Sequence, residues 1–321
     1  MNKDAKIYIA GHRGLVGGAI TRFLQSEGYT NLLTRTHKEL DLLNQKEVND
    51  FFEKEKPEYV FLAAAKVGGI GANSTYPADF IYQNTMIGFN VIHGAYKNGV
   101  KKLINLGSSC IYPKLAPQPM KEEYLLSDLL EPTNEAYAVA KISVIKLCMF
   151  YNRQYGTNYL SVMPTNLYGP GDNYDPDGSH VLPALIRKFH EAKVLGTDKV
   201  VLWGDGSPRR EFLFSDDLAQ ALVMLMRNKN AHDLTNPAGD FVNVGSGNDM
   251  TIMELAEKIK DVVYEGLPDR TCRIEWDKSK PNGTPQKLLD ISRITALGFS
   301  PETGLNEGIR LAYRDFVSSI K

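Results

Sequence analysis

The chain has 321 residues, 43% of them apolar and 10% aromatic, a composition typical of one large or two modest globular domains. Lysine and arginine number 37 against 38 for aspartate and glutamate, so the net charge of −1 argues against a nucleic-acid or membrane partner. The three cysteines, Cys110, Cys148 and Cys272, form no C-x-x-C pair, which argues against a disulfide framework or a metal site and favours a reducing compartment. Because no apolar run approaches the ~20 residues of a membrane span, we expect a cytoplasmic protein.

Short apolar runs alternate with helical patterns through the first half of the chain. Apolar residues with helical spacing predict a first helix through residues 16–24, and a second helix is expected from Asp79, as its cap, to Asn98. The runs predicted as buried strands are residues 6–10, 31–34, 59–63, 102–106 and 160–163. This alternation predicts an α/β fold, a Rossmann-type doubly wound parallel sheet with helices on both faces.

The second half changes character after Pro164. Glycines and prolines crowd the next segment, and a helical pattern follows over residues 182–193. Residues 241–244 resemble one more buried strand, which would return to the first sheet. We therefore expect residues 1–165, with about 236–250, to form the sheet domain, and residues 166–235 and 251–321 to form a smaller domain.

A glycine-rich loop follows the first predicted strand and opens the first predicted helix. It has the spacing G-x-x-G-x-x-G and comprises Gly11, His12, Arg13, Gly14, Leu15, Val16 and Gly17. Glycines permit a tight turn and a close backbone approach, while a helix N-terminus offers free N–H groups to a phosphate. Three glycines can also simply end a strand, but the strand–loop–helix context favours a dinucleotide-binding loop.

The end of the second predicted strand indicates which dinucleotide would bind. NAD-binding sheets place a carboxylate there, whereas residues 33–37 of this chain are L-T-R-T-H, with no acid before Glu39. Arg35, together with Arg13, could bind a 2′-phosphate instead, although an arginine that ends a strand is often only solvated. The sequence therefore favours NADP.

Tyr137 is the only one of the sixteen tyrosines with a lysine four residues later, Lys141. The spacing puts both side chains on one helix face, where the ammonium group lowers the tyrosine pKa from ~10 toward neutrality. On spacing alone, a plainer interpretation is an amphipathic helix with Tyr137 half-buried and Lys141 exposed. Ser108 alters this balance, because it directly follows the fourth predicted strand and ligands of such sheets bind at the carboxyl ends of strands. Together these residues predict a site for carbonyl chemistry.

In these motifs the sequence resembles the extended short-chain dehydrogenase/reductase family, and within it the enzymes that act on GDP-linked 4-keto sugars. The resemblance covers nearly the whole chain and rests on IAGHRGLVG at 9–17, AAAKVGGI at 63–70, YPADFIYQN at 76–84, GSSCIYPK at 107–114, EPTNEAYAVAK at 131–141, MPTNLYGP at 163–170 and KPNGTPQKLLD at 280–290. It implies NADPH-dependent 3,5-epimerisation and 4-keto reduction of GDP-4-keto-6-deoxy-D-mannose to GDP-L-fucose.

The resemblance also implies a role for each candidate catalytic residue. Cys110 would be the base and His180 the acid that invert C3 and C5, since the C4 ketone acidifies both positions; a thiol of pKa ~8.5 and an imidazole of pKa ~6.5 suit such transfers. Tyr137 would donate a proton to the C4 oxygen, Lys141 would support it and hold the nicotinamide ribose, and Ser108 would polarise the ketone. The implied NADP(H)-binding residues are the loop at 11–17, Arg35, Leu106, Gly107, Ser108, Ser109, Lys141, Pro164, Thr165, Asn166, Leu167 and His180.

For the nucleotide sugar, the resemblance implies Lys188 as a phosphate partner, Trp203 as an apolar wall, Arg210 as a diphosphate clamp and Asn282 as a further contact. Trp203 could equally belong to the core. Two positions depart from the family pattern: His37 stands where relatives have a second arginine, and Asn282 replaces an aspartate. A C4 reductase of a related GDP-4-keto-6-deoxy-heptose, with or without epimerase activity, therefore stays open as an alternative.

An alternative of another class is a non-catalytic NADP-binding sensor or scaffold. Such relatives typically lose the tyrosine–lysine pair, which this chain retains, so an enzyme is favoured. The resemblance further implies a homodimer, in which helices near 79–98 and 137–155 form a four-helix interface.

Overall fold

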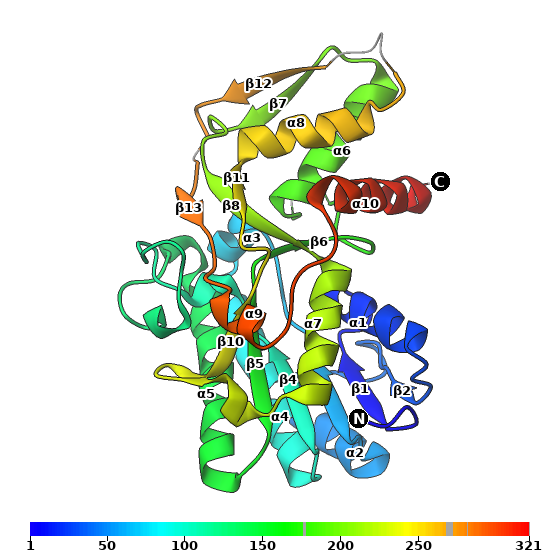
Figure 1. Ribbon diagram of the computed structural model, residues 1–321, viewed down its shortest axis with the longest axis vertical. Coiled ribbons are helices and arrows are strands. Elements are labelled where there is room, and N and C mark those ends of the chain that lie inside the picture. Colours follow the sequence, from blue (N-terminus) through cyan, green and yellow to red (C-terminus); the bar gives the residue numbers. More distant parts are fainter. Residues whose placement is uncertain (176–177, 268–271, 281, 321) are drawn as a thin grey trace.

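Seven strands form the larger sheet of the computed structural model, which describes residues 1–175, 178–267, 272–280 and 282–320 (Figure 1). The strand order is β2-β1-β3-β4-β5-β10-β9, and neighbours are parallel except for the terminal β9/β10 pair. The strands are β1 (Ile7–Ala10), β2 (Leu32–Leu33), β3 (Tyr59–Leu62), β4 (Lys102–Leu106), β5 (Tyr159–Pro164), β9 (Thr235–Asn236) and β10 (Gly239–Val244). The strand order reverses beside β1, and ligands of such sheets bind at the carboxyl ends of strands near this point.

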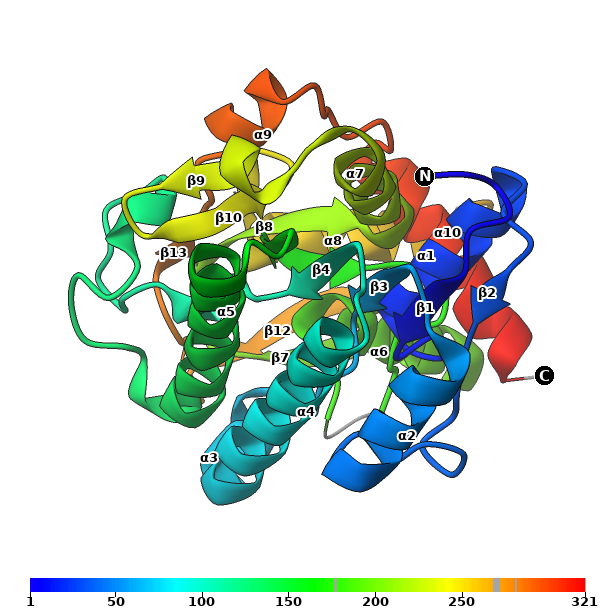
Figure 2. The ribbon, with the colours of Figure 1, turned by 90° about the horizontal axis from the view of Figure 1, so that it is seen from below.

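Helices cover both faces of this sheet (Figure 2). On one face, α1 (Leu15–Ser26) and α7 (Ser215–Asn228) share an apolar core with the strands. On the opposite face, a second core includes α2 (Gln45–Glu55), α4 (Pro77–Lys97) and α5 (Glu135–Tyr155). Because both faces are covered, β4 and β5 are buried along their whole length.

The doubly wound α/β sheet predicted from the sequence is confirmed. The ends of each predicted strand lie within two residues of the ends of an observed strand. Residues 241–244 return to the large sheet as part of β10, which pairs with β5. The helical spacing over residues 16–24 buries Ile20 and Leu24 against the sheet, as predicted. The prediction of Asp79 as a helix cap is wrong: α4 begins at Pro77, since proline suits the first helical position, and Asp79 lies in the first turn.

A smaller part of the structure lies beyond the carboxyl ends of the large sheet (Figure 1). In it, β8 pairs with β6, β11 and β13, while β7 and β12 form a separate parallel pair. Three helices pack with these strands around a core of their own. The elements are β6 (Asn166–Tyr168), α6 (Val181–Leu195), β7 (Lys199–Trp203), β8 (Arg209–Phe214), β11 (Asp249–Thr251), α8 (Ile252–Val263), β12 (Arg273–Asp277), β13 (Gln286–Lys287) and α10 (Leu305–Ser319).

Two short helices complete the fold, α3 (Ile70–Thr75) after β3 and α9 (Ser292–Ala296), which packs beside β10. Within the described ranges, no helix combines the length and the apolar character needed to cross a bilayer.

Helix α7 departs from the domain division expected from the sequence. That division places residues 166–235 in the smaller domain, yet α7 packs against α1 and contributes Leu218 and Leu222 to the core beneath the large sheet. We therefore propose a division that follows the cores, with α7 and α9 in the sheet domain and α6, α8 and α10 in the smaller domain.

Candidate active site

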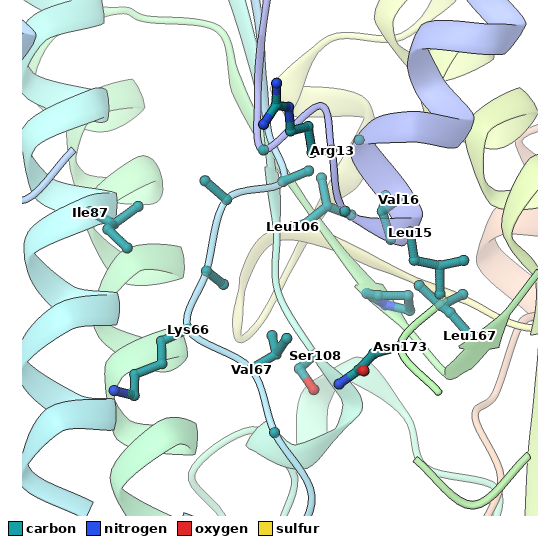
Figure 3. Close-up of a pocket in the computed structure, with 18 of the residues that line it drawn as sticks. Arg13, Leu15, Val16, Lys66, Val67, Ile87, Leu106, Ser108, Leu167 and Asn173 are labelled. Atoms are coloured by element: carbon teal, nitrogen blue, oxygen red, sulfur yellow. The ribbon is translucent and has the colours of Figure 1, made fainter. Parts of the chain in front are cut away.

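A cavity of about 820 Å³ opens at the carboxyl ends of the parallel strands (Figure 3). Its walls come from the loops after β1 and β3, the end of β4, the start of α5, and residues 164–167, 171–173 and 178–180. Every predicted cofactor residue lines this cavity except His12, and every predicted catalytic residue lines it except Cys110. The four predicted substrate residues lie outside it, on the smaller domain.

Close packing requires glycine at two positions of the loop after β1. A Cβ on Gly17 would lie 2.1 Å from the carbonyl oxygen of Gly11, and a Cβ on Gly11, where φ is +88°, would lie 2.8 Å from the backbone nitrogen of Ala64. Gly14 caps α1 without a side chain over the first-turn N–H groups. In addition, Nδ1 of His12 is buried without a hydrogen-bond partner among the described residues. This backbone cradle therefore fits a pyrophosphate.

Two arginines line the cavity near the end of β2, and their surroundings differ. Arg35 donates to the Glu55 carboxylate at 2.9 Å and to the Thr34 carbonyl oxygen at 2.8 Å, so its charge is already paired. In the part of the chain that the structure describes, Arg13 has no hydrogen bond or ion pair of its side chain. His37 also lines the cavity. Arg13 is therefore the more available cation for a phosphate.

The tyrosine–lysine pair lies at the start of α5. Lys141 Nζ donates to the Leu106 carbonyl oxygen at 2.8 Å and lies 5.7 Å from the centre of the Tyr137 ring. Only 6% of Lys141 is exposed, so the plainer interpretation with a solvated lysine is wrong, and burial lowers its pKa to about 8. Burial, and secondarily Cys110, raises the pKa of Tyr137, while a hydrogen bond with Ser108 lowers it. The pKa of Tyr137 is therefore raised, not lowered toward neutrality as expected from the nearby ammonium group, and the hydroxyl keeps its proton near neutral pH, as a proton donor must.

Cys110 lies beside this group, in the 3₁₀ turn Ser109–Ile111. Ser108 precedes the turn, and its hydroxyl oxygen accepts a hydrogen bond from the Cys110 backbone N–H at 3.3 Å. Burial raises the pKa of the Cys110 thiol, while Ser108, Lys287 and Lys141 lower it. The thiol therefore keeps its proton to a higher pH than the ~8.5 of an ordinary cysteine, and nearby cations favour its thiolate.

His180 reaches the same cavity from another part of the chain, as the residue that precedes α6. Desolvation by the surrounding protein lowers the pKa of its imidazole. The loop before it meets the loop after β3, since a Cβ on Gly69 would lie 3.4 Å from the Ser179 carbonyl oxygen. Two segments far apart in the sequence thus enclose the cavity beside His180.

The predicted substrate residues gather on the smaller domain. Trp203 ends β7 and is 67% exposed, so it does not belong to the core. Lys188 Nζ and Lys280 Nζ lie 5.9 and 5.6 Å from its ring centre. Asn282 Oδ1 accepts a hydrogen bond from the Asp205 backbone N–H at 2.9 Å, close after Trp203. Pro281, which belongs to the quoted string at 280–290, lies outside the described residues.

Arg210 and Lys287 bring two positive charges together. Strand β13 runs parallel to β8 in a register that pairs Lys287 with Arg210. Burial lowers the pKa of both groups, and Arg210 adds to the lowering at Lys287. Among the described residues, no carboxylate forms an ion pair with either. Lys287 is absent from the sequence-based predictions, and its only signal was its place within the string at 280–290. Two partly buried cations without an ion pair in the described part of the chain, with only the charge of Glu131 acting on Lys287 from farther away, favour an anionic ligand.

The glycine-loop cradle and the partly buried Tyr137, whose hydroxyl keeps its proton, share one cavity, an arrangement typical of a dinucleotide-dependent oxidoreductase. The chain belongs to the NAD dependent epimerase/dehydratase family, which matches residues 7–245. The resemblance to the extended short-chain dehydrogenases/reductases is thereby confirmed.

Relatives match over nearly the full length. The chain is 56% identical over 320 residues to "GDP-L-fucose synthase 1" of Arabidopsis thaliana, covering 99% of this chain and 95% of the relative. It is 54% identical over 319 residues to "GDP-L-fucose synthase" of Escherichia coli K12, covering 98% and 97%. Among solved structures, it is similar to "MlghC, GDP-mannoheptose C4 reductase from Campylobacter jejuni with NADP bound", with a TM-score of 0.90, 40% identity and 99% of each chain covered.

Proposed function

We propose that this chain is an NADPH-dependent enzyme that epimerises C3 and C5 of GDP-4-keto-6-deoxy-D-mannose and reduces its C4 ketone, giving GDP-L-fucose. The observation that carries this proposal is that Ser108, Tyr137, Lys141 and His180 line one cavity. Cys110 does not line it but lies close enough to Tyr137 and Lys141 to interact with them electrostatically. Reduction needs a proton donor at the ketone, whereas epimerisation needs an additional base and acid. The similarity to two GDP-L-fucose synthases supports the substrate.

The residues around the glycine loop fit NADPH. A side chain at Gly11 or Gly17 would fill the pyrophosphate cradle, which supports a role for both glycines in cofactor binding. Arg13, with Arg35, would hold the 2′-phosphate, and Lys141 would hold the nicotinamide ribose. When bound, the cofactor supplies the hydride for C4. The related GDP-mannoheptose C4 reductase, solved with NADP bound, supports this choice of dinucleotide.

For epimerisation, the C4 ketone makes the hydrogens at C3 and C5 acidic, because the charge left on carbon spreads to the C4 oxygen. The Cys110 thiolate takes the proton, so that an S–H bond forms as the C–H bond breaks, and Ser108 donates a hydrogen bond to the enolate oxygen. His180, as imidazolium, returns a proton to the same carbon from the opposite face. Lys287 and Lys141 favour the thiolate electrostatically. Exchange with water restores both groups before the second centre reacts.

For reduction, Tyr137 gives its hydroxyl proton to the C4 oxygen. Lys141, whose Nζ is held by the Leu106 carbonyl oxygen, stabilises the phenolate that remains. With a pKa of about 8, this lysine carries its charge at neutral pH. One cavity thus uses the same ketone first for carbon acidity and then as the hydride acceptor.

The smaller domain would hold the GDP group. Arg210 and Lys287, two cations without a carboxylate partner among the described residues, suit a diphosphate. The exposed ring of Trp203 offers a stacking surface for the base, and Lys188 lies beside it. These contacts recognise the nucleotide and leave the sugar free to reach the cavity.

A second candidate is a C4 reductase of a related GDP-4-keto-6-deoxy-heptose, with or without epimerisation. Asn282, in place of the family's aspartate, and the similarity to the Campylobacter heptose reductase favour it. The test is NADPH oxidation, followed by absorbance, with the hexose and heptose substrates in parallel. We expect kcat/KM for the hexose to be at least about tenfold higher. A preference for the heptose would establish the second candidate, and NADPH binding without oxidation of either substrate would leave the sensor or scaffold.

We also propose a homodimer built on α4 and α5, in the cytoplasm. Large apolar side chains are exposed on these two helices, namely Ile81, Tyr82, Phe89, Val139, Phe150 and Tyr155. A patch of this kind is typical of a surface that is covered in the assembled protein. Light scattering should give twice the 35.8 kDa of one chain. Three unpaired cysteines support a reducing compartment.

A further inference from the structure

The loop between β6 and α6 carries two polar side chains that the proposed function does not use. Asn173 and Ser179 both line the cavity, as does His180. The Ser179 hydroxyl oxygen is buried and has no hydrogen-bond partner within the described ranges. A buried hydroxyl without a partner is costly, which points to a ligand that completes it.

One hydrogen bond sets the orientation of the Asn173 amide. Its Oδ1 accepts from the Asp175 backbone N–H at 3.0 Å, and the oxygen is the only atom of an amide that can accept. The other end of the amide is therefore Nδ2, which lies beside Gly178, and in the described part of the chain its N–H groups have no hydrogen-bond partner. Figure 3 shows this nitrogen pointing toward the hydroxyl of Ser108. The N–H groups of this amide are thus directed toward the region beside Ser108.

Asp175 holds both side chains in place. Its carboxylate accepts from the Gly178 backbone N–H at 2.9 Å, and its carbonyl oxygen accepts from the Ser179 backbone N–H at 3.1 Å. A Cβ on Gly178 would lie 3.4 Å from this carboxylate and 3.9 Å from Asn173 Nδ2, so the turn is closely packed. Asn173 and Ser179 are therefore positioned before a ligand arrives, which lowers the entropic cost of binding.

We propose that Asn173 and Ser179 form a subsite for the hydroxyl group at C3 of the sugar. This rests on the proposed function, in which Ser108 binds the C4 oxygen. Because Ser108 binds the C4 oxygen, the Asn173 amide, which points toward Ser108, would contact a substituent on one of the two carbons next to C4. C3 carries a hydroxyl, whereas C5 carries a methyl group and the ring oxygen. Asn173 Nδ2 donates to the C3 oxygen, and Ser179 forms a second hydrogen bond. The subsite thereby selects sugars with this hydroxyl and holds C3 near Cys110.

The test compares the hexose substrate with its analogue that lacks the C3 hydroxyl. The wild-type chain should prefer the hydroxylated sugar at least tenfold in kcat/KM, because one well-placed hydrogen bond corresponds to about that factor. Asn173→Asp keeps the oxygen that accepts from Asp175 and removes both donors, so the preference should fall to about threefold or less. Ser179→Ala should reduce it in the same direction. The dissociation constant of NADPH should not change, which separates loss of the subsite from collapse of the cavity.

Asn228→Asp provides the matched control, since it makes the same change at an exposed site at the end of α7 and should keep the wild-type preference. A preference that survives both Asn173→Asp and Ser179→Ala overturns the subsite. If Asn173→Asp fails to fold, the Ser179→Ala comparison decides alone. A wild-type chain that leaves the hexose unreduced contradicts the proposed function instead, so the two failures are distinguishable.

Discussion

At the β1 end of the cavity the glycine loop contributes closely packed backbone, whereas on the smaller domain the candidate contacts are side chains. Gly11 and Gly17 leave no room for a Cβ, and the strands behind them are buried on both faces. On the smaller domain, Trp203 is exposed and Arg210 extends from β8, where side chains can change without moving a strand. The difference teaches that substitutions at the first end should abolish binding, while substitutions at the second should weaken it by degrees.

The largest effect on NADPH binding is expected at Gly17, where the backbone of α1 packs against the backbone of the glycine loop. Gly17→Ala places a methyl group 2.1 Å from the Gly11 carbonyl oxygen, so α1 must move away from the loop. We expect no measurable NADPH binding, by fluorescence titration, and a loss of about 1–3 kcal/mol in the free energy of unfolding.

The neighbouring glycine is the control. In Gly18→Ala, the new Cβ meets the flexible end of Arg22 at 3.4 Å, and alanine favours the helix over glycine. This variant should bind NADPH normally and be as stable as the wild type or more so. Equal loss of binding in both variants would contradict the steric account of the cradle.

Tyr137→Phe should have the next largest effect. Loss of the proton donor should lower kcat for reduction by about 10²–10⁴-fold. Exchange of the C3 and C5 hydrogens with solvent should continue, because it depends on Cys110 and His180. Proton NMR of the substrate in D₂O measures exchange separately from NADPH oxidation. Loss of both together would mean that the two reactions do not use separate groups.

The sequence predicted the residues at the β1 end of the cavity better than those on the smaller domain, because only the former leave local sequence patterns. Buried strands and a glycine loop leave local patterns, and Lys141 follows Tyr137 by one helical turn. Lys287 leaves no such pattern, because its position opposite Arg210 arises from the pairing of β13 with β8. The packing of α7 against α1 was not predictable for a similar reason: an amphipathic helix indicates that one face is buried, but not which sheet covers it.

Charge removal on the smaller domain should produce a graded effect. Arg210→Gln and Lys287→Gln should each raise KM for the sugar nucleotide about 10- to 100-fold, since hydrogen bonds from a cation to a phosphate are among the stronger ones. The dissociation constant of NADPH should stay unchanged. Lys54→Gln, at an exposed position of α2, is the control for charge alone. A tenfold loss of NADPH affinity in the Arg210 variant would contradict the separation of the two ends.

The smallest effect is expected from pH. Epimerisation needs the Cys110 thiolate and the His180 imidazolium, while burial raises the pKa of the thiol and desolvation lowers that of the imidazole. Between these two values, rising pH adds thiolate as fast as it removes imidazolium. Solvent exchange at C3 should therefore change less than about twofold between pH 6.5 and 8.5, the ordinary pKa values of the two groups. It should fall only below the lowered pKa of the imidazole and above the raised pKa of the thiol. A steep rise across the range would indicate that one group acts alone.

The most direct measurement is the deuterium content of the product formed in D₂O. With GDP-4-keto-6-deoxy-D-mannose and NADPH, the wild-type chain should place deuterium at both C3 and C5, as mass spectrometry and NMR can determine. Cys110→Ala should place none at either position in any reduced product. Complete reduction by the wild type with ordinary hydrogen at both carbons would contradict the account and leave a plain C4 reductase.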